Sequence, residues 1–133
     1  MLIVYLLEDN QTYSSRVRGL LSRARWRRDS LYTSYLALGE IMAGVEKAAN
    51  PKAARSVRET LAEMGFSFLP FVGDAVSPFS KLRANEGLKA PDAIHLACAA
   101  AAGMDLFLTG DNRLMRLDVP GIQFIADFNS SIL

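Results

Sequence analysis

The stretch Leu88–Leu114, LKAPDAIHLACAAAAGMDLFLTGDNRL, predicts a helix that begins beside a carboxylate. Pro91 suits the first turn of a helix, because its missing N–H would have no partner there and its φ is already helical. Asp92 next to it is favoured by the positive end of the helix dipole. Gly103 follows a run of alanines and is typical of the residue that ends a helix. The stretch therefore predicts an alanine-rich helix between Pro91 and Gly103.

A second carboxylate follows the strand predicted after this helix. Residues 105–109, DLFLT, read as a short buried strand, and Asp111 lies just past its end. Ligands of open α/β sheets bind beyond the carboxyl ends of the strands. Asp111 is therefore expected at that edge, and Asp92 can reach it from the start of its helix. Each acid also has a simpler explanation, Asp92 as a helix-dipole residue and Asp111 as a turn former.

The composition is that of a globular domain, with 50% of the 133 residues hydrophobic and 22% charged. A chain of this length can bury a substantial core, so we expect a single domain over residues 1–133. The only cysteine, Cys98, cannot form an internal disulfide and fits a packed thiol in the reducing cytoplasm. The apolar start, MLIVYLLEDN, is too short to span a membrane and has no basic segment before it. We expect it to be part of the fold.

Six arginines lie between residues 16 and 28, although the formal net charge of the chain is only +1. On a helix, Arg16, Arg23 and Arg27 form one stripe beside an apolar face. A solvated helix face is the simpler interpretation of this stripe. Contact with RNA phosphates or with an acidic partner segment is the alternative, and it requires independent signs of nucleic-acid chemistry.

Helices and strands alternate along the chain. Residues 2–7 are compatible with either a buried strand or a short helix. Besides the helix ending at Gly103, the pattern predicts helices at 12–26, 35–49, 51–64, 74–85 and 112–117, and strands at 31–34, 66–71, 105–109 and 121–126. Such alternation predicts an α/β fold with a parallel sheet covered on both faces.

A third carboxylate, Glu40, lies in the apolar segment LALGEIMAG. By itself it is explained as a glutamate that reaches solvent or pairs with an arginine. Together, Glu40, Asp92 and Asp111 indicate a cluster of acids, which a divalent cation would make tolerable. Oxygen ligands favour Mg²⁺ or Mn²⁺, and one cysteine and one histidine cannot form a zinc cluster. Such a site activates water and neutralises charge on a phosphoryl group.

Other catalytic classes are less compatible with the sequence. His95 lies one turn after Asp92 between apolar neighbours, which favours a hydrogen-bonded core or supporting residue over a catalytic base. No serine stands in a nucleophile-elbow pattern, and no glycine-rich phosphate loop is present. Serine hydrolases and nucleotide-binding proteins are therefore excluded.

Five segments, VYLLEDN, TSYLALGEIMAG, FSFLPF, KAPDAIHLACAAAAG and DLFLTGDNRL, resemble in order and spacing the PIN-domain ribonucleases, above all the VapC-type toxins of toxin–antitoxin pairs. The resemblance implies a three-layer α/β/α fold with a central parallel sheet, and an acid cluster that holds Mg²⁺ or Mn²⁺ and cleaves single-stranded RNA. By position it makes Glu40, Asp92 and Asp111 the catalytic and metal-binding acids. Ser34 and Thr109 match supporting polar residues.

The resemblance has one departure. The first acid of the family belongs to an Asp-x-Asn motif that ends the first strand, and this motif would fall before Met1. We therefore expect the first strand to be truncated or absent in this chain. One explanation is a missing N-terminal segment, which we favour because loss of a central strand leaves two edges unpaired. The others are a degenerate family member with weakened metal binding, and use of Leu2–Leu7 as the strand.

The resemblance implies a metal-dependent endoribonuclease, the toxin of a VapBC-type pair, in the cytoplasm. Its partners would be RNA, a VapB-like antitoxin and a second copy of the chain, with no membrane involved. Arg16, Arg23 and Arg27 would be candidate contacts for RNA or the antitoxin. One alternative is a catalytically silent PIN-like module that binds RNA or the antitoxin. Another is a small-molecule phosphohydrolase that uses the same acids.

Overall fold

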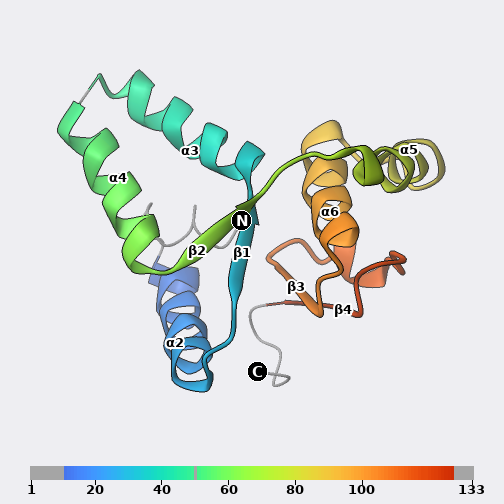
Figure 1. The fold of residues 1–133 in the computed structure, drawn as a ribbon, viewed down its shortest axis with the longest axis horizontal. Helices are drawn as coiled ribbons and strands as arrows, with labels where there is room; N and C mark the ends of the chain where they lie inside the picture. Colours follow the sequence, from blue (N-terminus) through green and yellow to red (C-terminus); the bar gives the residue numbers. More distant parts are fainter. Residues whose placement is uncertain (1–10, 50, 128–133) are drawn as a thin grey trace.

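The computed structural model describes residues 11–49 and 51–127. In chain order its helices and strands are α2 (Gln11–Arg27), β1 (Leu31–Ser34), α3 (Tyr35–Lys47), α4 (Pro51–Glu63), β2 (Phe66–Leu69), α5 (Val76–Asn85), α6 (Ala90–Ala102), β3 (Leu106–Thr109) and β4 (Phe124–Asp127), with short 3₁₀ helices η1 (Gly73–Ala75) and η2 (Leu114–Arg116) (Figure 1). The predicted alternation is confirmed for these residues. The apolar run at residues 2–7 lies outside them. No helix in the described ranges is both long and apolar enough to cross a membrane.

Two predicted helices differ most in extent from those observed, and the strand predicted at 121–126 is observed at Phe124–Asp127. The helix predicted at 74–85 begins only at Val76, after η1. An α-helix starting at Asp74 would require an N–H at position 78, and Pro78 has none; from Val76 the proline falls in the first turn, where no N–H is needed. The helix predicted at 112–117 is only the 3₁₀ helix η2, preceded by a turn that the Asp111 side chain closes on the Arg113 N–H.

All strand pairs are parallel, as predicted, but they form two separate sheets. β1 pairs with β2 in the register Leu31↔Phe66, and β3 pairs with β4 in the register Leu106↔Phe124. Among the residues the structure describes, neither β1 nor β3 has a strand partner on its second edge. The α/β class with parallel strands is confirmed, whereas the described strands do not form one continuous sheet.

Helix α6 lies between the two strand pairs: it contacts β1 and β2, and Phe107 of β3 and Ile125 of β4 pack against the hydrophobic cluster that includes its side chains. It packs against α5 and η1 on one side and against β1, β2 and α3 on the other (Figure 1). Every residue from His95 to Ala100 is buried, and Leu96 is 0% exposed. The small alanine side chains let neighbouring elements approach the helix axis closely. Cys98 is buried here, which raises the pKa of its thiol and confirms the predicted packed cysteine.

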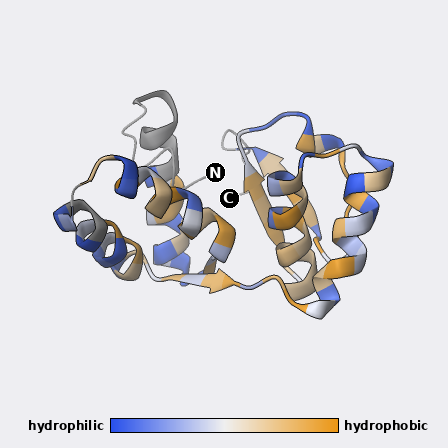
Figure 2. Ribbon diagram, turned by 90° about the horizontal axis from the view of Figure 1, so that it is seen from above, coloured by the Kyte–Doolittle hydropathy of each residue, from blue (hydrophilic) through white to orange (hydrophobic). Residues whose placement is uncertain are grey.

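The main hydrophobic cluster lies around this helix. Leu82 from α5, Leu114 from η2, and Val119 and Ile122 from the segment before β4 pack on one face of α6. Hydrophilic residues gather on the outer helices (Figure 2). Burial of apolar area in this cluster is the dominant stabilising contribution, and it holds α6 and the loop after β3 in place.

Gly121 makes the closest backbone approach to α6. Its φ is +101°, and a Cβ at this position would lie 2.4 Å from the carbonyl oxygen of Ala100. We expect Gly121→Ala to lower the free energy of unfolding by about 2–4 kcal/mol, from backbone strain and displacement of the helix. Urea unfolding of the variant measures this loss.

Gly103→Ala is the matched control. Gly103 ends α6, as predicted, with φ +70°, and has open space where a Cβ would stand. Its substitution adds only the left-handed strain, about 1–2 kcal/mol. Equal losses of unfolding free energy in the two variants would show that the close approach to Ala100 does not contribute to the effect of Gly121→Ala.

Candidate functional site

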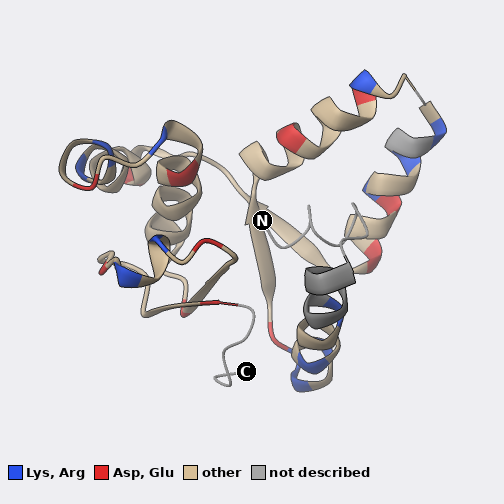
Figure 3. Cartoon of the chain, turned by 180° about the vertical axis from the view of Figure 1, so that it is seen from behind, with Lys and Arg blue, Asp and Glu red and all other residues tan. Residues whose placement is uncertain are grey.

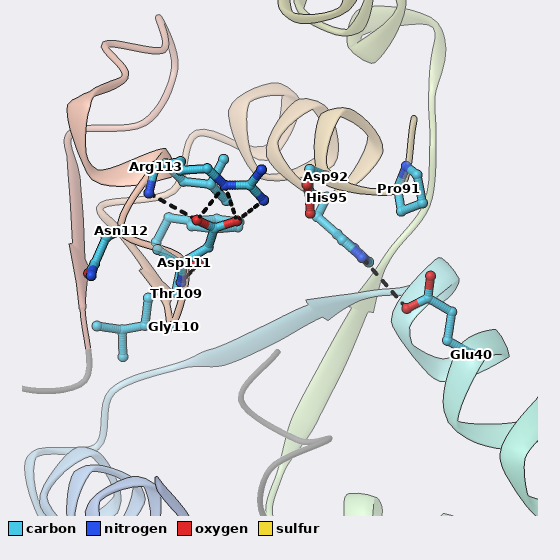
Figure 4. A pocket seen from close by; sticks show the side chains of 12 residues that line it. Glu40, Pro91, Asp92, His95, Thr109, Gly110, Asp111, Asn112 and Arg113 are labelled. Carbon is cyan, nitrogen blue, oxygen red and sulfur yellow. Dashed lines mark hydrogen bonds and ion pairs between the residues drawn. The ribbon is translucent and has the colours of Figure 1, made fainter. Parts of the chain in front are cut away.

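A pocket of about 590 Å³ lies at the carboxyl end of β3 (Figure 4). Its walls come from three parts of the chain: Glu40 from α3, the start of α6 with Asp92 and His95, and residues 107–114 from β3 and the following turn. The structure thus places Glu40, Asp92 and Asp111 around one pocket, together with Thr109.

Glu40 faces His95 across the junction of α3 and α6. Oε2 of Glu40 is 4.0 Å from Nε2 of His95, and the glutamate side chain is 44% exposed. The His95 ring is buried and its Nδ1 is 2.6 Å from the hydroxyl of Ser34. Burial lowers the pKa of the imidazole, against the opposing effect of the Glu40 and Asp92 carboxylates, which favours the neutral ring. His95 is a buried hydrogen-bonded residue, as the sequence predicted.

Ser34 is the last residue of β1 and the N-cap of α3. Its Oγ accepts the N–H of Ala37 at 3.0 Å, which satisfies one of the free donors at the helix start. Because it also contacts His95, this one hydroxyl connects β1 and α3 to α6. These two bonds hold the Ser34 hydroxyl against His95, a residue that lines the pocket.

Asp92 lies in the first turn of α6 and is partly buried. Lys89, the N-cap residue, makes no side-chain capping bond, so the free N–H groups at the helix start favour the nearby carboxylate. Asp92 also lies three residues before His95, on the same side of the helix. The local sequence therefore fixes both side chains at the pocket.

Asp111 is held from two sides. Its N–H donates to Oγ1 of Thr109 at 3.0 Å, and Thr109 itself is buried. Its carboxylate accepts from the backbone N–H of Arg113 at 2.9 Å and from the Arg113 guanidinium, whose Nη2 is 2.6 Å from Oδ2. These hydrogen bonds hold the pKa of the Asp111 carboxyl below its usual value, and the carboxylate in turn raises the pKa of Arg113.

The three carboxylates fit a divalent cation in donor type but are not gathered as a closed set. Carboxylate oxygens, with the hydroxyl of Thr109 nearby, suit Mg²⁺ or Mn²⁺. In the described parts of the chain, however, no three His, Cys, Asp or Glu side chains are close enough to hold a metal ion together. Arg113 already occupies the Asp111 carboxylate, and Glu40 is turned toward His95 (Figure 4).

The arginine stripe on α2 lies away from this pocket. None of the described α2 residues lines it, and Figure 3 shows the basic residues of α2 across β1 from α6. Arg23 and Arg27 are exposed, and Arg27 pairs with Asp29 at 2.7 Å. The side chain of Arg16 lies outside the described residues. The stripe and the acids therefore occupy different surfaces.

Arg113 is the pocket residue that the sequence interpretation missed. The usable signal was the Asp-x-Arg spacing in a turn, because an aspartate that accepts the N–H two residues later brings that residue's side chain beside it. In this turn the arginine forms a forked pair with the carboxylate.

Comparisons with known proteins agree with the fold. The PIN domain family model matches residues 2–120. One chain in the crystal structure of VapBC2 from Rickettsia felis bound to a DNA fragment from their promoter has a TM-score of 0.74 and 16% identity, covering 95% of this chain and 92% of that chain. No curated protein gave a significant match. The resemblance seen in the sequence is confirmed at the level of the family: the chain belongs to the PIN-domain proteins.

Proposed function

We propose that this chain is a metal-dependent endoribonuclease that cleaves single-stranded RNA. The observation that supports it most is the convergence of Glu40, Asp92 and Asp111 from three chain segments on one pocket, in a member of the PIN-domain family. Acids collected at the end of a parallel strand suit hydrolysis of a phosphodiester better than any other chemistry this pocket offers.

Glu40, Asp92 and Asp111 would hold Mg²⁺ or Mn²⁺ at this pocket. When bound, the cation supplies activation of water and neutralisation of charge on the phosphodiester. Asp92 lies in the first turn of α6, where the helix dipole favours a negative charge, and hydrogen bonds to Arg113 hold the pKa of the Asp111 carboxyl below its usual value. Glu40 is the most exposed of the three, which suits it to orient water or accept a proton.

Arg113 has a second use in this proposal. Once a cation or substrate draws Asp111 away, its guanidinium is left at the pocket wall with five N–H donors. A planar guanidinium matches the paired oxygens of a phosphate. Arg113 would then hold the RNA backbone at the position where it now holds the carboxylate.

The partners follow from the same proposal. The fold shared with a chain of the VapBC2 complex supports a toxin that pairs with a VapB-like antitoxin, and we propose a homodimer acting in the cytoplasm. Arg16, Arg23 and Arg27 on α2 are proposed as contacts for RNA or for the antitoxin, and Arg23 and Arg27 do not line the pocket. Their contribution would depend strongly on salt concentration.

The direct test incubates the purified chain with labelled single-stranded RNA and Mg²⁺ or Mn²⁺, with EDTA as the control. Cation-dependent cleavage supports the proposal. Intact RNA together with no Mn²⁺ binding in a calorimetric titration excludes an enzymatic role for this polypeptide.

A second candidate function is a catalytically silent module that binds RNA or an antitoxin. It is favoured by the pairing of Asp111 with Arg113 and by the lack of a gathered metal site among the described residues. It predicts RNA binding that is unchanged by EDTA and by Asp111→Asn, without cleavage.

The Asp111–Arg113 pair is expected to compete with the cation. Arg113→Gln removes the forked pair, so Mn²⁺ should bind about 2- to 5-fold more tightly, the range expected for losing a partly exposed ion pair. Calorimetric titration with Mn²⁺ measures the change. Arg116→Gln is the control, because Arg116 is exposed on η2, carries the same charge and does not line the pocket. Equal changes in Mn²⁺ affinity in the two variants would show that the effect comes from removing a positive charge and not from breaking the Asp111–Arg113 pair.

A further inference from the structure

The bond between Ser34 and His95 determines which nitrogen of the imidazole carries the proton. The two side chains are 61 residues apart in sequence and both are buried, with 2.6 Å between Oγ and Nδ1. A serine hydroxyl has one proton to donate and two lone pairs. One lone pair accepts the N–H of Ala37 at 3.0 Å.

Only one arrangement of protons satisfies every group. If Nδ1 carried the proton, Ser34 would accept twice, and its own proton would have no acceptor among the described residues. A buried donor left without an acceptor is strongly unfavourable. If the hydroxyl instead donates to Nδ1, all three groups are satisfied, and the proton of the neutral ring lies on Nε2.

The protonated nitrogen faces Glu40. Nε2 is 4.0 Å from Oε2 of Glu40, beyond hydrogen-bond range but within reach of a small side-chain rotation (Figure 4). Glu40 is itself 44% exposed, and His95 is the side-chain partner that the described residues provide for its carboxylate.

We propose that His95 is a positioning residue: Ser34 holds its ring in the Nε2–H tautomer, and the Nε2–H directs the carboxylate of Glu40 into the pocket. The role of Glu40 there rests on the proposed function; the tautomer and the contact do not. His95 does not touch the reacting atoms. It acts through Glu40, as an outer hydrogen-bond partner acts on a ligand.

The tautomer can be read directly, because His95 is the only histidine in the chain. Long-range ¹H–¹⁵N spectra of the uniformly labelled protein at pH 8, without metal or RNA, should show a protonated Nε2 and an unprotonated Nδ1. Ser34→Ala should give a mixture of tautomers. Thr33→Ala is the matched control, because this neighbouring buried hydroxyl has no hydrogen-bond partner in the described part of the chain, and it should leave the spectrum unchanged.

The contact with Glu40 is tested in the same spectra. Glu40→Gln should shift the Nε2 resonance, whereas Glu46→Gln, an exposed glutamate farther along α3, should not. A ring protonated on Nδ1, or an Nε2 signal unaffected by Glu40→Gln, overturns the proposal. Since these signals need no substrate, absence of RNA cleavage in the wild type counts against the proposed function alone.

The effect on the pocket is tested by Mn²⁺ titration. His95→Leu should weaken Mn²⁺ binding about 10- to 100-fold, as loss of an outer hydrogen-bond partner does. His95→Gln retains a donor and should restore most of the affinity. Equal loss in both variants at unchanged thermal stability would overturn the positioning role.

Discussion

Asp92→Asn is expected to reduce the rate of Mg²⁺-dependent RNA cleavage by at least about 100-fold. Loss of a residue that only hydrogen-bonds to a metal ligand costs up to about 100-fold, and loss of a ligand itself should cost at least as much. The amide has the same shape as the carboxylate and fits the partly buried first turn of α6, but it lacks the charge that the proposed cation requires. Stability should fall by no more than about 1 kcal/mol, the usual value of a helix-dipole interaction. Single-turnover cleavage and urea unfolding of the same preparations separate the two effects.

Asp118→Asn is the control for this result. Asp118 is exposed and does not line the pocket, so the substitution removes the same charge at a position outside the candidate site. Its cleavage rate should match the wild type. Cleavage by Asp92→Asn at a wild-type rate would remove this carboxylate from the mechanism, and a large loss of stability would make it a structural residue.

Leu96→Ala should lower the free energy of unfolding by about 2–5 kcal/mol. Leu96 is 0% exposed at the centre of α6, in contact with the cluster that includes Leu82 and Leu114. The neighbouring side chains belong to several elements, so they cannot all move to fill the space that the leucine leaves. Chemical denaturation followed by circular dichroism measures the loss. Val76→Ala, at a residue 52% exposed, should cost less than about 0.5 kcal/mol.

The same experiment tests the prediction of a single domain. Leu61 on α4 is 2% exposed and lies in the other part of the molecule, near β2. If α6 couples the two sheets, Leu61→Ala and Leu96→Ala should each shift one common transition. Two separate transitions, each moved by only one of the variants, would contradict a single cooperative unit.

Much of the fold could be predicted because its signals are local. Pro91, Asp92 and Gly103 mark helix α6 within the sequence itself, and the observed helix has these limits within one residue. Parallel pairing followed from alternation of helices and strands. The position of Asp111 at a pocket followed from the rule that ligands bind at carboxyl ends of strands. Glu40 was harder to place, since its segment is also a good packing face, and the family resemblance supplied much of the argument.

The remainder depends on contacts between distant residues. Ser34 and His95 meet only because α6 packs against β1, and neither local segment specifies that approach. The forked pair of Arg113 with Asp111 depends on a side-chain rotamer in a turn. The division of strands into two pairs is likewise a property of three-dimensional packing, which periodicity does not encode.

Within residues 11–49 and 51–127, β1 and β3 each have one edge without a strand partner, and this has a consequence for how the chain meets other chains. In a four-residue strand, alternate residues direct their backbone groups to opposite sides, so each edge presents about two donors and two acceptors. These edges are short, which limits unspecific strand addition and fibril growth. Because β1 ends at Ser34 and β3 ends at Thr109, both close to the pocket, any segment that paired in parallel with either edge would bring its own C-terminal residue to the rim of the acidic site. A strand added at either edge would thus also add a residue to the rim of the site.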